Sequence, residues 1–179
     1  MKKEAIHPDS GYYNRYISQV PDVDLNTALD QSLAALQSLD IAALEPLSDY
    51  AYAPGKWTVK MVLQHIVDTE RVFSFRAMLF SRHDRQLPPS MDENEYAANA
   101  PVEHRQIKEI LDELKALRMA TIAQYNSFTP AILLTTGMSW KTEMSVLAMG
   151  FTIVGHQIHH LNILQERYLQ PYTNKDVSI

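Results

Sequence analysis

Residues Met144 to Tyr168 read MSVLAMGFTIVGHQIHHLNILQERY, and this stretch decides the fold that we expect. We interpret it as one long helix, because its apolar residues recur with the spacing of a helix that faces a core. His156 and His160 are four residues apart, which places them one turn apart on the same helical face. The line that steps by four and three, as a core-facing seam does, consists of Met149, Ile153, His156, His160, Ile163 and Arg167.

Two imidazoles on this face lie where a helical bundle would normally place leucine or isoleucine. A buried imidazole needs a partner for each ring nitrogen, and an unpartnered one costs roughly 1–3 kcal/mol. A metal ion is one partner that would satisfy both rings together. The apolar run therefore suggests a buried metal site as well as a helix.

Three further long helices are predicted from the same periodicity and from residues that favour helix starts. They are Leu25 to about Asp40 after the N-cap Asp24, Val59 to Ser81 after the N-cap Thr58, and a third with Pro101 in its first turn that ends near Phe128. Thr142 is the expected cap of the fourth helix, and Pro171 is expected to end it.

The connections between these helices are long and carry most of the proline. No stretch alternates at period two for long enough to predict a sheet. We expect an irregular lead-in at 1–23 with at most one helical turn, in which Tyr12, Tyr13 and Tyr16 pack against the body. The other expected connections are one with a short turn at 41–56, a crossover with at most a short helix at 83–101, a loop at 131–141 and a tail at 172–179.

Length and composition agree with one soluble helical domain. The chain has 179 residues, of which 46% are hydrophobic and 21% charged, and only five are glycine. Four amphipathic helices in one domain of this size predict an all-α four-helix bundle with long crossover loops.

Charge and cysteine content exclude several functions. The net charge is -5 and no dense cluster of lysine and arginine occurs, so we expect no nucleic-acid partner. The absence of cysteine excludes disulfides, thiolate nucleophiles and cysteine-based metal sites. Neither a secretory signal nor a membrane-spanning run is found, so we expect a cytoplasmic protein with no membrane partner.

The predicted second helix supplies a third histidine for the metal site. Its inward line is expected to pass through His65, then Asp68 or Thr69, then Val72, Phe75 or Arg76, and Leu79. If this helix neighbours the last one, His65 can converge with the histidine pair. Three histidines with an open position are typical of catalytic rather than structural metal sites. Imidazole suits zinc, nickel, copper and iron, so the ligands alone do not select the ion.

Two further residues are weaker candidates. Asp68 could hold the second nitrogen of a ligand or accept a proton from bound water, or it could be a surface acid paired with Arg71. His159 could contact a ligand or a substrate, or it could lie beside the site facing solvent. The order HQIHH has the outline of the zincin motif HExxH, but Gln157 stands where the general base should be. A protease of that class is therefore not predicted.

Two segments together resemble the DinB superfamily. Residues Lys56 to Asp68, KWTVKMVLQHIVD, resemble the W-[ST]-x-x-x-[VI]-[LV]-x-H-[LIV]-x-[DE] opening of its second helix. The histidines at 156, 159 and 160 resemble its second motif, H-x-x-x-H, often written H-x-x-H-H. The resemblance covers most of the chain and looks closest to the YfiT-like branch.

The resemblance implies a metalloenzyme in a four-helix bundle that is commonly dimeric. The implied ligands of one divalent ion, for which zinc or nickel is the expectation, are His65, His156 and His160. Characterised relatives include thiol S-transferases that use bacillithiol, mycothiol or glutathione, and a maleylpyruvate isomerase. Other members are described only as metal-dependent hydrolases.

We therefore expect a thiol S-transferase or small-molecule hydrolase, with a low-molecular-weight thiol as possible cosubstrate and a homodimer by family analogy. Two alternatives stay open. One is a metal-stabilised bundle without turnover that acts as a stress-response or interaction module. The other is a plain bundle whose histidines are satisfied by water and by neighbouring side chains.

Overall fold

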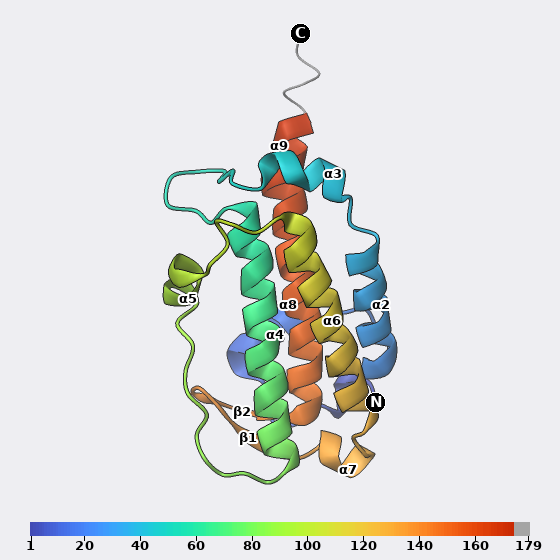
Figure 1. Ribbon diagram of the computed structural model, residues 1–179. Helices are drawn as coiled ribbons and strands as arrows, with labels where there is room; N and C mark the ends of the chain where they lie inside the picture. Colours follow the sequence, from blue (N-terminus) through green and yellow to red (C-terminus); the bar gives the residue numbers. More distant parts are fainter. Residues whose placement is uncertain (174–179) are drawn as a thin grey trace.

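Four long helices run side by side and form a bundle (Figure 1). The structure is a computed structural model and describes residues 1–173 of the chain. The long helices are α2 (Leu25–Gln37), α4 (Val59–Ser81), α6 (Ile107–Asn126) and α8 (Val146–Ile163). Contacts join α4 to α6, α6 to α2, α2 to α8 and α8 to α4. The predicted all-α four-helix bundle is confirmed, and the two helices that carry the histidine motifs are neighbours.

Local capping explains where these helices begin. The carboxylate of Asp24 accepts from the Thr27 amide, and the hydroxyl of Thr58 accepts from the Met61 amide, so both predicted caps are confirmed. The cap of α8 is Ser145 and not Thr142, because Thr142 belongs to a strand. The last helix therefore begins three residues later than that cap implied.

The expectation that the chain forms no sheet was wrong. Strands β1 (Thr136–Ser139) and β2 (Thr142–Ser145) pair antiparallel, with Thr136 opposite Ser145 and Ser139 opposite Thr142. Four residues are too few to establish a period-two pattern. The two-residue turn between them places Trp140 at φ 56°, where Asn-Gly or Asp-Gly is the usual signal. The hairpin thus carried no recognisable turn sequence.

Two predicted helix limits were also wrong. The third long helix begins at Ile107, and Pro101 lies in the preceding connection; the Glu109 carboxylate caps the start by accepting from the Gln106 amide at 2.8 Å. Glutamine is not among the favoured N-caps, so the start was not visible in the sequence.

Pro171 does not end the last helix, which continues as a π-helical segment (Leu164–Leu169) and α9 (Gln170–Thr173). The wider π turn just before the proline interrupts the ordinary hydrogen-bond pattern that proline would break. Of the expected tail, 174–179 lie outside the described residues.

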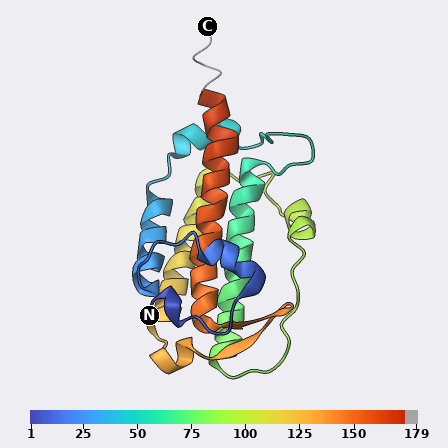
Figure 2. The same cartoon turned by 180° about the vertical axis from the view of Figure 1, so that it is seen from behind.

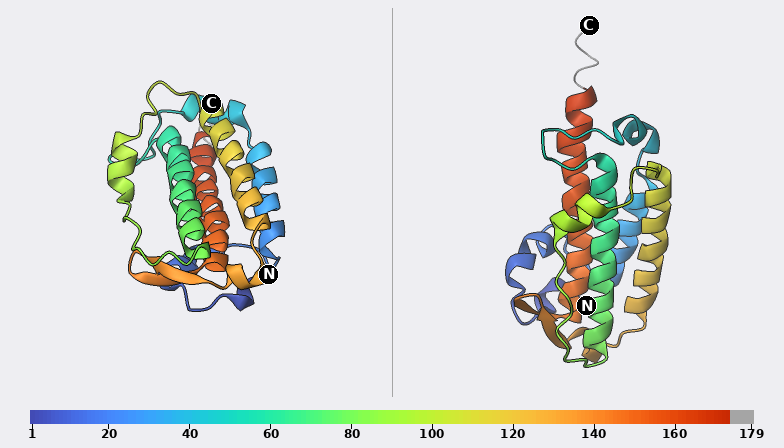
Figure 3. Two further views of the ribbon diagram at one scale, coloured as in Figure 1. Left: turned by 60° about the horizontal axis from the view of Figure 1, so that its bottom comes forward. Right: turned by 60° about the vertical axis from the view of Figure 1, so that its left-hand side comes forward.

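Short elements occupy the connections. Between α2 and α4 lie α3 (Ile41–Leu44) and a 3-10 turn (Glu45–Leu47), and between α4 and α6 lies α5 (Glu93–Asn99). Figure 3 shows α5 beside α4, outside the bundle. The short helix α7 (Pro130–Leu133) precedes the hairpin. The crossover with a short helix was predicted, and it proves to form one wall of the site.

The N-terminal lead-in packs against the bundle at α8, as expected, and it holds more helical structure than the one turn expected. It contains the 3-10 turns Lys3–Ala5 and Gly11–Tyr13 and the single-turn helix α1 (Asn14–Ile17), which crosses α8 (Figure 2). The contact is close because Gly155 has no side chain: a Cβ there would lie 2.0 Å from the Tyr16 carbonyl oxygen. This packing brings the tyrosines of the lead-in to the face of α8 that carries the histidines.

A polar layer crosses the middle of the bundle between two hydrophobic clusters. One cluster includes Phe73, Phe80, Tyr125 and the first half of α8, and the other includes the starts of α4 and α6 with Tyr168. All members of the layer are buried polar side chains at mid-helix positions. They are Ser32, His65, Thr69, Glu70, Arg118, Thr121, His156, Gln157 and His160.

A buried ion pair forms one half of this layer. Arg118 donates from Nε and Nη2 to the two carboxylate oxygens of Glu70, each at 2.8 Å, and from Nη1 to the Ser32 hydroxyl. The Thr121 hydroxyl donates to the same carboxylate at 2.8 Å. Gln157 donates to the Ser32 carbonyl at 2.9 Å, so it faces the bundle interior. The pair links α2, α4 and α6, and the histidines occupy the other half of the layer.

Among the described helices, none is long and apolar enough to cross a membrane.

Candidate metal centre

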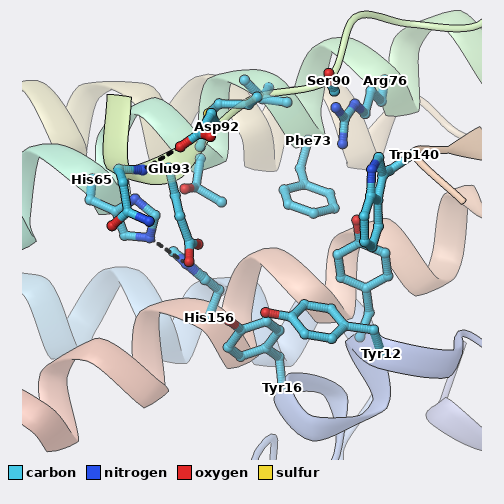
Figure 4. A pocket seen from close by; sticks show the side chains of 15 residues that line it. Tyr12, Tyr16, His65, Phe73, Arg76, Ser90, Asp92, Glu93, Trp140 and His156 are labelled. Atoms are coloured by element: carbon cyan, nitrogen blue, oxygen red, sulfur yellow. Dashed lines mark hydrogen bonds between the residues drawn. The ribbon is translucent and has the colours of Figure 1, made fainter. Parts of the chain in front are cut away.

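The three histidines predicted to converge are brought together by α4 and α8. The Nε2 atom of His156 lies 3.0 Å from Nε2 of His65 and 3.1 Å from Nε2 of His160. Ring centroids of the three imidazoles are 4.4 to 4.8 Å apart. Figure 4 shows His65 and His156 approaching each other from facing helices. The arrangement points one nitrogen of each ring at a common position.

Helix periodicity and packing explain why the rings meet. His156 and His160 are stacked one turn apart on α8, and His65 lies on the face of α4 that packs against it. The Trp57 ring, whose centroid is 4.8 Å from that of His65, closes the side toward the start of α4. The edge of the Tyr16 ring contacts His156 from α1, with 5.2 Å between centroids. The imidazoles are therefore enclosed on several sides by rigid rings.

Burial keeps these imidazoles neutral. It is the main cause that lowers the pKa of His65 to about 4 and the pKa of His160 to about 2. The pKa of His156 is also held well below its ordinary value by burial and by the neighbouring histidines. Near pH 7 each ring therefore offers a lone pair on one nitrogen.

The donor set fits a divalent transition-metal ion. In three neutral imidazoles that meet at their Nε2 atoms, the lone pairs of these nitrogens face one another with no positive charge between them. A metal cation at the common position would accept all three lone pairs. Nitrogens bound to one ion at about 2.0–2.1 Å would lie roughly 3.0–3.4 Å apart, which matches the separations of His156 from His65 and from His160, and all three ligand atoms lie within 4.8 Å of one another. Within residues 1–173, no carboxylate joins the three histidines as a fourth ligand. His65, His156 and His160 could therefore hold a metal and leave a position free.

The free side of the histidine cluster opens into a cavity of about 350 Å³. The face of α4 supplies the line His65, Thr69, Val72, Phe73 and Arg76, which settles the alternatives left by periodicity. The neighbouring positions differ: Phe75 is 48% exposed, and Asp68 does not line the cavity. The remaining walls come from the lead-in (Tyr12, Tyr13, Tyr16), the hairpin turn (Trp140), His156 and the segment that leads into α5 with its first residues (Ser90 to Asn94).

Two charged groups of the cavity were not identified as site residues from the sequence. Glu93 and Arg76 lie about 17 residues apart and belong to different elements, so no local spacing connects them. Figure 4 shows the Glu93 side chain extending from α5 toward His65 and His156. Asp92 also lines the cavity, but its carboxylate caps α5 by accepting from the Asn94 and Glu95 amides. Helical periodicity did place Arg76 on the inward line, and this was the only available signal.

Asp68 and His159 lie beside the histidine cluster. The Asp68 carboxylate accepts from Gln64 Nε2 at 3.0 Å and lies 3.8 Å from Arg71, which is the surface pairing weighed as its alternative role. Burial raises the pKa of Asp68. His159 is half-buried and packs edge-on against Tyr16, with 5.4 Å between ring centroids. Neither residue points its ligand atom at the common position of the three imidazoles.

Comparison with known proteins agrees with this arrangement. A family model of the DinB superfamily matches residues 16–164. The chain belongs to the DinB superfamily. Among solved structures it is similar to YfiT from Bacillus subtilis, with a TM-score of 0.66 and 17% sequence identity over 93% of this chain and 90% of that one. YfiT is described as a probable metal-dependent hydrolase with an unusual four-helix bundle topology. A search of curated proteins finds no match. At this identity the likeness to YfiT shows a common fold.

Proposed function

We propose that this DinB-superfamily protein is an enzyme that binds one divalent metal ion through His65, His156 and His160 and acts on a small molecule. The observation that carries the proposal is the convergence of three neutral imidazoles, two of which, His65 and His156, line an open cavity. A metal that served stability alone would be expected in a closed site with four protein ligands. The description of YfiT as metal-dependent is consistent with this proposal.

The reaction is hydrolysis or S-transfer, in which the deprotonated sulfur of a small thiol attacks an electrophile and the whole thiol becomes attached to it. When bound, a divalent ion supplies Lewis acidity, which lowers the pKa of a water or thiol and makes it nucleophilic near neutral pH. Any thiol must come from a cosubstrate, because the chain has no cysteine. Zinc and nickel are the proposed ions, since both accept imidazole ligands.

The side chains around the cluster can be given roles. Glu93 offers a carboxylate on the cavity side of the histidines, and it can accept the proton that the nucleophile loses. Asp68 was the acid expected from the sequence, but its bond to Gln64 and its contact with Arg71 direct it elsewhere. Tyr16 and Trp57 pack on the imidazoles and hold their orientation. The homodimer and the identity of any thiol stay predictions.

Metal binding is tested first. Elemental analysis and calorimetric titration of metal-stripped protein with Zn²⁺ and Ni²⁺ should give one ion per chain. His156→Ala should reduce the affinity by more than about 100-fold, because one of three ligands is lost. The exposed His104 is the matched control, and His104→Ala should bind as the parent does. Equal binding by the two variants would refute the three-histidine site.

Catalysis is tested next, on metal-loaded protein. Turnover of generic ester, amide and epoxide substrates, with and without small thiols, should depend on added metal. Glu93→Gln should lower kcat by about 100-fold or more while leaving metal affinity unchanged. A protein that binds metal tightly but turns over none of these substrates would favour the non-catalytic bundle instead.

A further inference from the structure

The cavity beside the histidines contains a buried cation at its other end. Arg76 is only 4% exposed and lines the same cavity as His65 and His156. It lies eleven residues after His65 on α4, which is three helical turns and about 16 Å between Cα atoms on one face. Figure 4 shows Arg76 near Trp140 at one end and the two histidines at the other, with Phe73 between them.

Arg76 has hydrogen-bond acceptors but no counter-ion among the described residues. Its Nη1 donates to the Ser139 hydroxyl at 3.0 Å, and its Nη2 donates to the Pro89 carbonyl at 2.8 Å. The Nε–H is buried and has no partner. No aspartate or glutamate in residues 1–173 lies within 4.0 Å of this guanidinium. The Tyr13 hydroxyl is a further polar neighbour of this guanidinium, so none of the groups around it is a carboxylate.

The other fully buried arginine of the protein provides an internal comparison. Arg118 is paired through two hydrogen bonds with Glu70, which neutralises its charge. A buried charge without a partner is strongly unfavourable. Residues 1–173 thus supply a carboxylate to the arginine in the closed half of the bundle and none to the arginine that faces the cavity.

A purely structural role does not account for the charge at Arg76. Its two bonds tie β1 and the crossover before α5 to α4. Both acceptors are neutral oxygens, which an uncharged donor could also satisfy. The Phe73 ring, whose centroid lies 5.7 Å from Cζ of Arg76, favours a cation but leaves its charge uncompensated. A positive charge at this position is explained if Arg76 binds an anion. The anion can reach the guanidinium from the cavity, which Arg76 lines.

We propose that the cavity binds a small molecule with a carboxylate that pairs with Arg76. Its apolar body would pack between Phe73 and the rings of Tyr12 and Tyr16, and its other end would reach the histidine cluster. A monoanion is favoured over a phosphate dianion because Asp92 and Glu93 line the same cavity and repel further negative charge. Only the reaction at the histidine end depends on the proposed function; the anion site at Arg76 stands on its own.

The test uses three probes that differ at one end: 4-phenylbutyrate, its primary amide and 3-phenylpropylphosphonate. Binding is followed by the fluorescence of Trp140, which lines the cavity, and by calorimetry, in metal-free and metal-loaded protein. The acid should bind about 10- to 100-fold more tightly than the amide, as expected for hydrogen bonds to a charged group. Arg76→Gln should remove this preference and leave the affinity for the amide unchanged.

Three control variants separate anion binding from structural effects. Ser139→Ala removes one structural bond of Arg76 and should keep the acid preference. Arg71→Gln removes an exposed arginine of the same helix that pairs with Glu113, and it should also keep the preference. Arg76→Lys retains a charge but not the planar fork, so the preference should shrink without vanishing. If Arg76→Gln fails to fold, the lysine variant and the acid–amide comparison in the parent protein still decide the question.

Two results would overturn the proposal. One is equal binding of acid and amide by the parent protein, or a preference that survives in both Arg76 variants. The other is tighter binding of the phosphonate than of the carboxylate, which would assign the site to a different anion. Failure of the proposed function looks different: the parent protein would not bind metal, yet the metal-free protein would still prefer the acid.

Discussion

Removal of metal should make the protein sharply sensitive to mild acid. In the unfolded chain a histidine titrates near pH 6.5, whereas burial holds the pKa of His65 at about 4 and that of His160 at about 2. The pKa of His156 is lowered well below its ordinary value for the same reason. Between pH 6.5 and 5 the unfolded state therefore binds protons that the folded state does not. The sign follows directly: stability is full above pH 6.5 and falls as the pH drops.

The size of the effect does not depend on the exact folded pKa values, provided that they lie below 5. Each such histidine then loses about 2 kcal/mol of stability between pH 7 and pH 5. Three of them together lose about 5–6 kcal/mol, which is comparable to the whole stability of a typical domain. The raised pKa of Asp68 works in the opposite direction, but it concerns a single half-buried group.

Urea unfolding of metal-stripped protein at several pH values measures this loss. Metal-loaded protein should be less sensitive between pH 7 and pH 6, because the bound ion opposes protonation of its ligands. His160→Asn should reduce the pH slope of the metal-free protein by about one third. A metal-free stability that stays level from pH 7 to pH 5 would refute the buried neutral state of these rings.

Three further predictions concern the packing that supports the site. Gly155→Ala should lower the free energy of unfolding by about 1–3 kcal/mol, measured by thermal unfolding, because its Cβ would displace the Tyr16 backbone. The same variant should bind ligands in the cavity more weakly but still bind metal, because α4 and α8, which carry the three histidines, keep their positions. Glu70→Ala should cost about 3–5 kcal/mol by chemical denaturation, since it leaves Arg118 charged and unpaired, and adding Arg118→Met should recover part of the loss. Ser145→Ala should cost about 1 kcal/mol by removing the N-cap of α8, and a loss below a few tenths would contradict that role.

The sequence revealed the long helices because their signals are local. Spacing of apolar residues marks a buried face within a few turns, and caps such as Asp24 and Thr58 mark helix starts. The same local spacing placed His156 and His160 on one face, and it placed His65 on an inward face of another helix. The hairpin and the start of α6 were missed because their local sequence signals are weak. The hairpin has strands of four residues and a turn at Trp140, and α6 starts after Gln106, which is a poor cap.

The composition of the cavity could not be predicted in this way, because its walls come from segments far apart in the chain. Tyr16 reaches His156 only because Gly155 lets α1 lie directly on α8. Glu93 faces the histidines only because the crossover lays α5 beside α4.

Sequence alone determined the helical class of the chain, the positions of its long helices and the residues able to offer imidazole nitrogens to a metal. Tertiary structure decided which charges are paired: it gave Arg118 a carboxylate from another helix, and among the described residues it left Arg76 with none beside an open cavity. The physical reason is that helical periodicity fixes the face on which a side chain lies, whereas its electrostatic partner depends on which other element packs against that face.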